Sequence, residues 1–148
     1  MDTRIERLRA IRQLETEEQM QEFDELLESL GGEDSTDPAL LSDLLLTFVD
    51  DTQGKEHMWS LLHFVEAYPD EVYVPTLVRV LPSMRPHARQ WGVRLLLRVL
   101  NNTTSHSHLR QLYPQLPKSD QQQLVEFLTE VAQKSSDLAG KVAEVTTT

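Results

Sequence analysis

Apolar side chains spaced three or four residues apart recur along almost the whole chain, and this pattern predicts an all-α fold. One such stripe comprises Met20, Phe23, Leu27 and Leu30, which a helix of 3.6 residues per turn gathers on one face. The same spacing returns in 55–67, 87–100 and 119–134. We therefore predict six or seven helices joined by short turns.

Helix start and stop signals mark the limits of the first helices. Thr16 and Gln19 have the spacing of a capping box, so the residues before Gly31 form either two helices or one kinked helix. A glycine pair then ends this part of the chain. Asp37, followed by a proline, begins the next helix, which we expect over 38–49.

The middle of the chain contains an ambiguous segment. The valines of 71–81 favour a strand, whereas Pro75 argues against a place inside a sheet. We predict a helix here, because the neighbouring segments are helical and no partner strand is evident. Pro82 and Pro86 predict a turn before the helix at 87–100.

Successive helices pair into hairpins, 38–49 with 55–67 and 71–81 with 87–100. We predict that they pack as a HEAT-like, α-solenoid-like single domain. A globular helical bundle is the alternative, because the sequence contains no clean repeat. The predicted division is an N-terminal helical arm (1–32), a helical domain (33–134) and a frayed C-terminal tail (135–148).

Composition excludes several classes of protein. The net charge of −10 disfavours binding to nucleic acid, since phosphate binding needs a basic surface. No secretory signal and no membrane-spanning apolar stretch is present, and the absence of Cys fits a reducing compartment. We therefore expect a cytoplasmic protein with no membrane partner.

The acidic residues are concentrated in one stretch. Thirteen acids and no Lys or Arg lie between Arg12 and Lys55, interleaved with apolar residues. A disordered acidic tail would lack that apolar content, so we expect an ordered negative face that attracts a basic partner. The alternative is a solvated surface that keeps the protein soluble.

The following stretch is basic, with no acid between Val72 and Ser119. We expect its arginines to pair with the acidic N-terminal third. A phosphate-binding strip or a contact with acidic groups on a partner are the alternatives. Trp59 and Trp91 are predicted to pack in the core, although tryptophan is also frequent at interface hot spots.

Motif searches give no support to an enzyme, a metal site or a cofactor. The chain has no Cys nucleophile, nucleophile elbow, phosphate-binding glycine loop or zinc-protease motif. His63 and Glu66 share one helix face, and a polar pair that fixes helix packing, with Arg98 as the partner of Glu66, is the favoured interpretation.

The middle of the chain resembles immunity protein family 30 of bacterial polymorphic toxin systems. The resemblance covers roughly residues 38–130 and rests on these positions: Asp50, Asp51, Met58, His63, Glu66, Tyr73, Leu77, Trp91, Arg98, Leu100 and Asn101. It implies a non-enzymatic inhibitor that binds the toxic domain of a cognate effector. It also adds Asn101 to the polar network of His63, Glu66 and Arg98, which we expect to hold the fold.

Charge placement suggests which residues contact the toxin. If the toxin is a nuclease, its cleft should be basic, and acidic side chains would fit it. We predict contacts mainly from acids in turns and loops: Glu33, Asp34, Asp37, Asp43, Asp50 and Asp51. The alternative function is a helical adaptor or scaffold that binds a basic or amphipathic protein segment. The sequence leaves the oligomeric state open.

Overall fold

The computed structural model describes residues 1–32 and 36–147, and in this part the chain is helical with no strand. Eight α-helices follow one another: α1 (Thr3–Ala10), α2 (Glu17–Leu30), α3 (Pro38–Leu45), α4 (Lys55–Glu66), α5 (Asp70–Asn101), α6 (Thr103–Leu112), α7 (Lys118–Ala132) and α8 (Ser136–Thr146). A 3-10 turn, Tyr113–Gln115, separates α6 from α7. None of the described helices is both long enough and apolar enough to cross a membrane.

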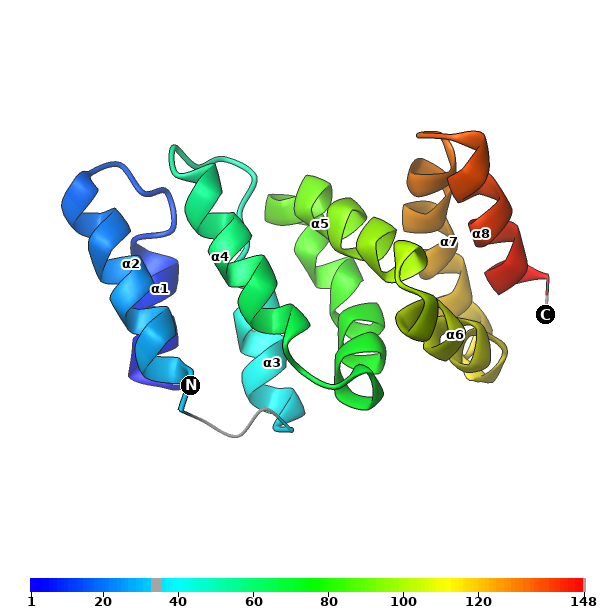
Figure 1. Cartoon of the computed structure of the whole chain (residues 1–148), viewed down its shortest axis with the longest axis horizontal. Coiled ribbons are helices and arrows are strands. Elements are labelled where there is room, and N and C mark those ends of the chain that lie inside the picture. The colour runs from blue at the N-terminus through cyan, green and yellow to red at the C-terminus, as the bar shows by residue number, and fades with distance from the viewer. Residues whose placement is uncertain (33–35, 148) are drawn as a thin grey trace.

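The helices stand side by side along the long axis, with α1 and α2 at one end and α7 and α8 at the other (Figure 1). One continuous core runs between them, from Ile5 in α1 to Val145 in α8. Consecutive helices contact each other in pairs, α1 with α2, α3 with α4 and α7 with α8. The all-α prediction is therefore confirmed.

Helix α5 includes the ambiguous segment 71–81, so the prediction of helix there is confirmed. The predicted turn between Pro82 and Pro86 is wrong, because the chain stays helical through both prolines and departs from helical geometry only at Ala88 (φ −144°, ψ 37°). A proline lacks an N–H and its ring crowds the carbonyl four residues back, so it favours a break nearby without fixing its position.

Residues 1–32 pack on the rest of the chain. They form two helices, and the Thr16 hydroxyl caps the second by accepting from the backbone N–H of Gln19. Arg9 of α1 donates to the backbone carbonyl of Asp43, and Arg12, just after α1, donates to that of Leu46. Both carbonyls lie at the end of α3. These are the carbonyls that a helix C-terminus leaves without a partner, and a cation there also complements the helix dipole.

The C-terminal segment differs from the prediction. From Ser135 onward we expected a frayed tail, and the structure instead contains α8. The Ser135 hydroxyl caps this helix by accepting from the N–H of Leu138, and Leu138 and Val145 are buried. Their spacing of seven residues places both side chains on one helix face, which α5, α6 and α7 cover.

The connection from α1 to α2 is tight at Leu14, which is fully buried and has a positive φ of 53°. Only glycine adopts such angles without strain, so the packing of Leu14 must offset a cost of about 1–2 kcal/mol. Gly54 makes room for it: a Cβ on Gly54 would lie 2.7 Å from Leu14 Cδ1.

We predict that Gly54→Ala lowers the free energy of unfolding by about 1–3 kcal/mol, because the new methyl group overlaps a buried side chain. Gly140→Ala is the matched control. A Cβ on Gly140, inside α8, meets nothing within 4 Å, so this change should raise stability by about 0.5–1 kcal/mol. Urea unfolding followed by circular dichroism measures both, and equal effects would contradict the close packing at Gly54.

Candidate functional site

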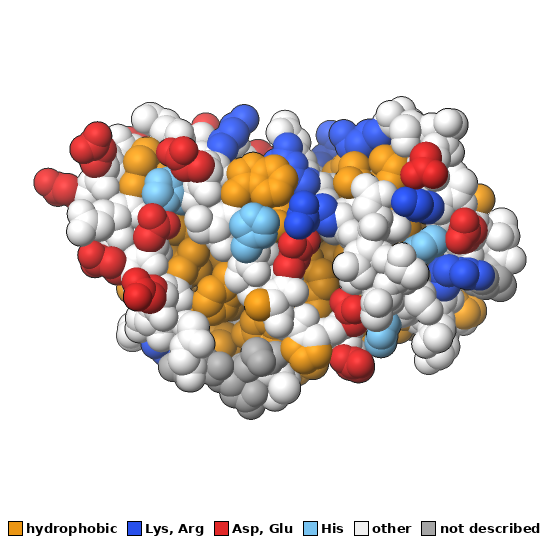
Figure 2. Space-filling model, viewed as in Figure 1, with side chains coloured by type: hydrophobic (Ala, Val, Ile, Leu, Met, Phe, Trp, Pro, Cys, Tyr) orange, Lys and Arg blue, Asp and Glu red, His pale blue; other side chains and the backbone are white. Residues whose placement is uncertain are grey.

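The acidic stretch folds into helix α2. This helix carries six acids and no Lys or Arg: Glu17, Glu18, Glu22, Asp24, Glu25 and Glu28. Phe23, Leu27 and Leu30 are buried on its inner side. In the space-filling view, acidic side chains gather over α2 at one end of the molecule (Figure 2).

Four of these acids form no ion pair within the described part of the chain. Glu22 receives two hydrogen bonds from Arg7, at 2.6 and 2.9 Å, which lower the pKa of Glu22 below its usual range. Asp24 lies 2.9 Å from His57 Nδ1. The others are exposed and form no ion pair within the described part of the chain: Glu17, Glu18, Glu25 and Glu28. At 3.6 residues per turn they occupy an arc of roughly 100° opposite the buried stripe. We call these four residues the acidic ridge.

The predicted toxin contacts are placed differently from the ridge. Glu33 and Asp34 lie outside the described residues. Asp37 caps α3 by accepting from the N–H of Ala39 at 3.0 Å, and Asp43 lies 3.8 Å from an Arg9 nitrogen. Asp51 is exposed. The contact role of all six acids remains a prediction.

Asp50 has a structural task. Its carboxylate accepts from the backbone N–H groups of Gln90 at 3.0 Å and Trp91 at 3.2 Å, just after the break at Ala88. Its own N–H donates to the carbonyl of His87 at 2.8 Å. Asp50 therefore caps the second half of α5 from another loop. The two partners lie forty residues apart in sequence, and no local signal could have revealed this bond.

We predict that Asp50→Ala lowers the free energy of unfolding by about 1–2 kcal/mol, through the loss of a helix cap. Asp51→Ala removes the same charge from the exposed neighbouring position and should stay within about 0.5 kcal/mol of the original protein. Chemical denaturation of the two variants under identical conditions measures the difference. A stability loss at Asp51 as large as that at Asp50 would contradict the capping role.

Three of the five arginines of α5 form ion pairs within the described part of the chain, and their partners lie outside the acidic N-terminal third. Arg85 pairs with Glu126 and Arg89 with Glu130, both on α7. Arg98 pairs with Glu66 of α4. The expected pairing with residues 1–51 is therefore wrong for Arg85 and Arg89, because α7 lies against α5 and supplies the carboxylates. The predicted pairing of Arg98 with Glu66 is confirmed. As a result, α5 leaves the acidic ridge without neutralising partners.

Arg94 has no carboxylate partner among the described residues and instead lies between two indole rings. Its guanidinium is 4.5 Å from the centre of the Trp91 ring and 5.1 Å from that of Trp59. The two rings meet edge to face at 5.6 Å. Trp91 is buried, as predicted, whereas Trp59 is only half-buried. A cation over an aromatic face is stabilised by the ring quadrupole, so Arg94 is held in one orientation.

The four residues of the predicted polar network separate into different contacts. Arg98 donates two hydrogen bonds to Glu66, at 2.6 and 2.8 Å, and this contact raises the pKa of Arg98. His63 is exposed and lies against Trp59, with ring centres 6.3 Å apart. The Asn101 side-chain oxygen accepts from Lys141 of α8 at 2.9 Å. The ion pair thus joins α4 to α5, while Asn101 joins α5 to α8.

Tyr73 of α5 is buried beside this ion pair, and its hydroxyl has no hydrogen-bond partner among the described residues. Burial, and then the negative charge of Glu66, raise the pKa of Tyr73 above its ordinary value of 10.0. A buried hydroxyl without a partner costs stability, because it has lost its hydrogen bonds to water.

We predict that Tyr73→Phe raises the free energy of unfolding by about 1 kcal/mol at neutral pH, because the unsatisfied hydroxyl is removed. The raised pKa also means that the folded state resists deprotonation, so the original protein should lose stability as the pH rises above 10. The variant should lack that part of the loss. Denaturation at pH 7 and at pH 10.5 measures both effects, and a destabilised variant would show that the hydroxyl is hydrogen-bonded.

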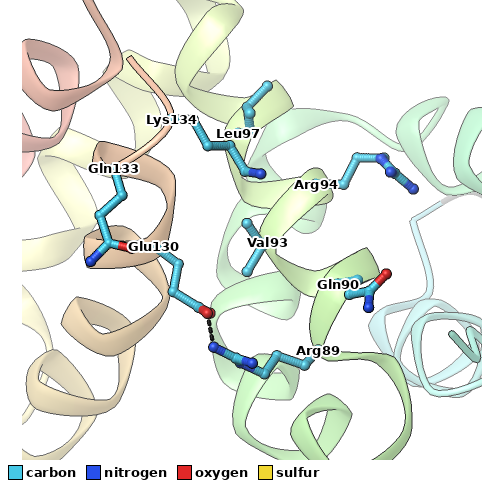
Figure 3. Close-up of a pocket in the computed structure, with 8 residues that line it drawn as sticks. All are labelled: Arg89, Gln90, Val93, Arg94, Leu97, Glu130, Gln133 and Lys134. Carbon is cyan, nitrogen blue, oxygen red and sulfur yellow. Dashed lines mark ion pairs between the residues drawn. The ribbon is translucent and has the colours of Figure 1, made fainter. Parts of the chain in front are cut away.

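A groove of about 420 Å³ lies between the second half of α5 and α7. Its lining residues are Arg89, Gln90, Val93, Arg94, Leu97, Glu130, Gln133 and Lys134, and we call it the cationic groove. Figure 3 shows the Arg89–Glu130 ion pair at one end and the Lys134 side chain extending from the end of α7 toward α5. Within the described residues, no group of three or more His, Asp or Glu could hold a metal ion.

An all-helical chain whose unneutralised charges lie on open surfaces has the features of a helical protein-binding module. The family model for Immunity protein 30 matches residues 10–109, so the chain belongs to this family of immunity proteins, which act against toxins. The matched region includes the acidic ridge, the cap at Asp50 and most of the cationic groove. No curated protein and no solved structure matches the chain.

Proposed function

We propose that this protein neutralises a cognate antibacterial toxin domain by binding it through the acidic ridge of α2. The observation that carries the proposal is a set of four exposed carboxylates on one face of an ordered helix, with no ion pair to the described residues, in a member of the Immunity protein 30 family. The protein acts as a non-enzymatic inhibitor in the cytoplasm of the cell that makes the toxin.

The physical basis is electrostatic attraction to a basic partner. A surface of one sign speeds encounter with an oppositely charged surface and orients it, and the effect weakens with added salt. A nuclease toxin would present such a surface, because its cleft must bind phosphates. The helix backbone that carries these carboxylates is already ordered, so binding does not have to order it, which favours affinity.

The acids predicted from the sequence to contact the toxin have different roles in this proposal. Asp51 is exposed and suits a direct contact, whereas Asp50 supports the surface through its cap on α5. Asp37 and Asp43 cap or pair within the molecule and would add to the negative field. For the fold, we propose a HEAT-like stack of helical hairpins, which would present successive helices such as α2 and α4 on one face.

The test is co-expression with the toxin domain encoded beside this chain, with growth and co-purification as readouts. We expect the original protein to restore growth and to form a complex that weakens with salt. A double change, Glu25→Lys with Glu28→Lys, should slow association by about tenfold or more at 50 mM NaCl, and by much less at 500 mM.

The matched control is Glu71→Lys with Asp120→Lys, two exposed acids on α5 and α7. It changes the net charge by the same amount and should leave association within about threefold of the original protein. Equal slowing by both double variants would show that overall charge, rather than the ridge, governs binding. No complex with the original protein would overturn the proposed function for that toxin.

A further inference from the structure

The cationic groove has the opposite charge from the rest of the molecule. Three cations and one carboxylate line it, a net of +2 in a chain of net −10. Arg89 and Glu130 neutralise each other. The two remaining cations, Arg94 and Lys134, have no carboxylate partner within the described part of the chain.

Arg94 and Lys134 both line the groove, together with the buried Val93 and the half-buried Leu97. Figure 3 shows Arg94 directed away from α7, whereas the Lys134 side chain reaches toward α5 from the end of α7. The stacking of Arg94 on Trp59 and Trp91 fixes its guanidinium before any partner arrives. Tryptophan and arginine are among the residues enriched at the hot spots of protein interfaces.

We propose that the cationic groove is a second docking surface, which binds an acidic segment of the toxin domain. This inference rests on the proposed function. The segment lies across α5, with its carboxylates meeting Arg94 and Lys134 and an apolar side chain covering the half-buried Leu97. Charge complementarity favours an acidic protein segment over nucleic acid, because the acidic ridge and the net charge of the chain repel a polyanion that extends beyond the groove.

The test measures binding of the toxin domain to two single variants. Lys134→Gln removes an exposed charge and should weaken binding by about three- to fivefold at 50 mM NaCl. Arg94→Gln should weaken it by about 10- to 30-fold. Lys118→Gln, at the opposite end of α7, is the matched control and should leave the affinity unchanged.

A second measurement reports where the toxin domain binds rather than how tightly it binds. This measurement does not depend on the packing of Arg94. The chain has no Cys, so Lys134→Cys and Lys118→Cys each give one site for a polarity-sensitive fluorophore. We expect the emission of the label at position 134, and not at 118, to shift when the toxin domain binds. The labelled proteins are first shown to have unchanged circular dichroism spectra.

The outcomes separate the two proposals. One outcome is that the toxin binds, that the affinities of both groove variants stay within twofold of the original protein, and that the emission of the label at 134 does not change. This outcome overturns the second docking surface and leaves the acidic ridge in place. If Lys134→Gln instead weakens binding of a single-stranded RNA oligonucleotide and not of the toxin, the groove is a phosphate site and the inference is wrong. If the original protein does not bind the toxin at all, the proposed function fails, and this inference fails with it.

Discussion

A helix that breaks inside a protein leaves backbone groups without partners on both sides of the break, and a single residue binds three of these groups here. At the Ala88 break in α5, the N–H of Asp50 binds the carbonyl before it and the carboxylate binds two N–H groups after it. This one contact fixes the direction of the second half of α5. The positions of Trp91, Arg94 and Arg98 follow from it, and so do the indole cluster, the ion pair to α4 and the groove beside α7.

The parts of the fold that the sequence predicts are those determined by neighbours along the chain. The period of the apolar residues gives the helices, and Thr16 and Asp37 mark two of their starts correctly. Predictions are less accurate where contacts with an element distant in sequence determine the local structure. The prolines of α5 indicate a break nearby, but its position at Ala88 depends on Asp50, which approaches from another loop. The residues from Ser135 onward fold as α8 because α5, α6 and α7 cover their apolar face.

The candidate site shows the same division. Local charge density predicts an ordered negative face, and four of the six acids on the ordered helix α2 fall opposite its buried stripe. The prediction of contacts from turn and loop acids rests on charge placement along the sequence. Charge placement does not reveal the partners that Asp37, Asp43 and Asp50 have in the folded chain. The role of Arg94 is equally hidden, because its two rings come from α4 and α5 and meet only in the folded chain.

The separation of charge along one face has a consequence for recognition. Acidic side chains gather over α2 at one end, whereas lysines and arginines lie from the middle of the face onward, where further acidic side chains are interspersed with them (Figure 2). A surface whose negative and positive charges lie in different places both attracts an approaching charged protein and rotates it. A partner with the complementary arrangement is rotated into register before contact, whereas one with uniform charge is attracted at one end and repelled at the other. Such a face can distinguish partners by how their charges are ordered, even when their total charge is the same.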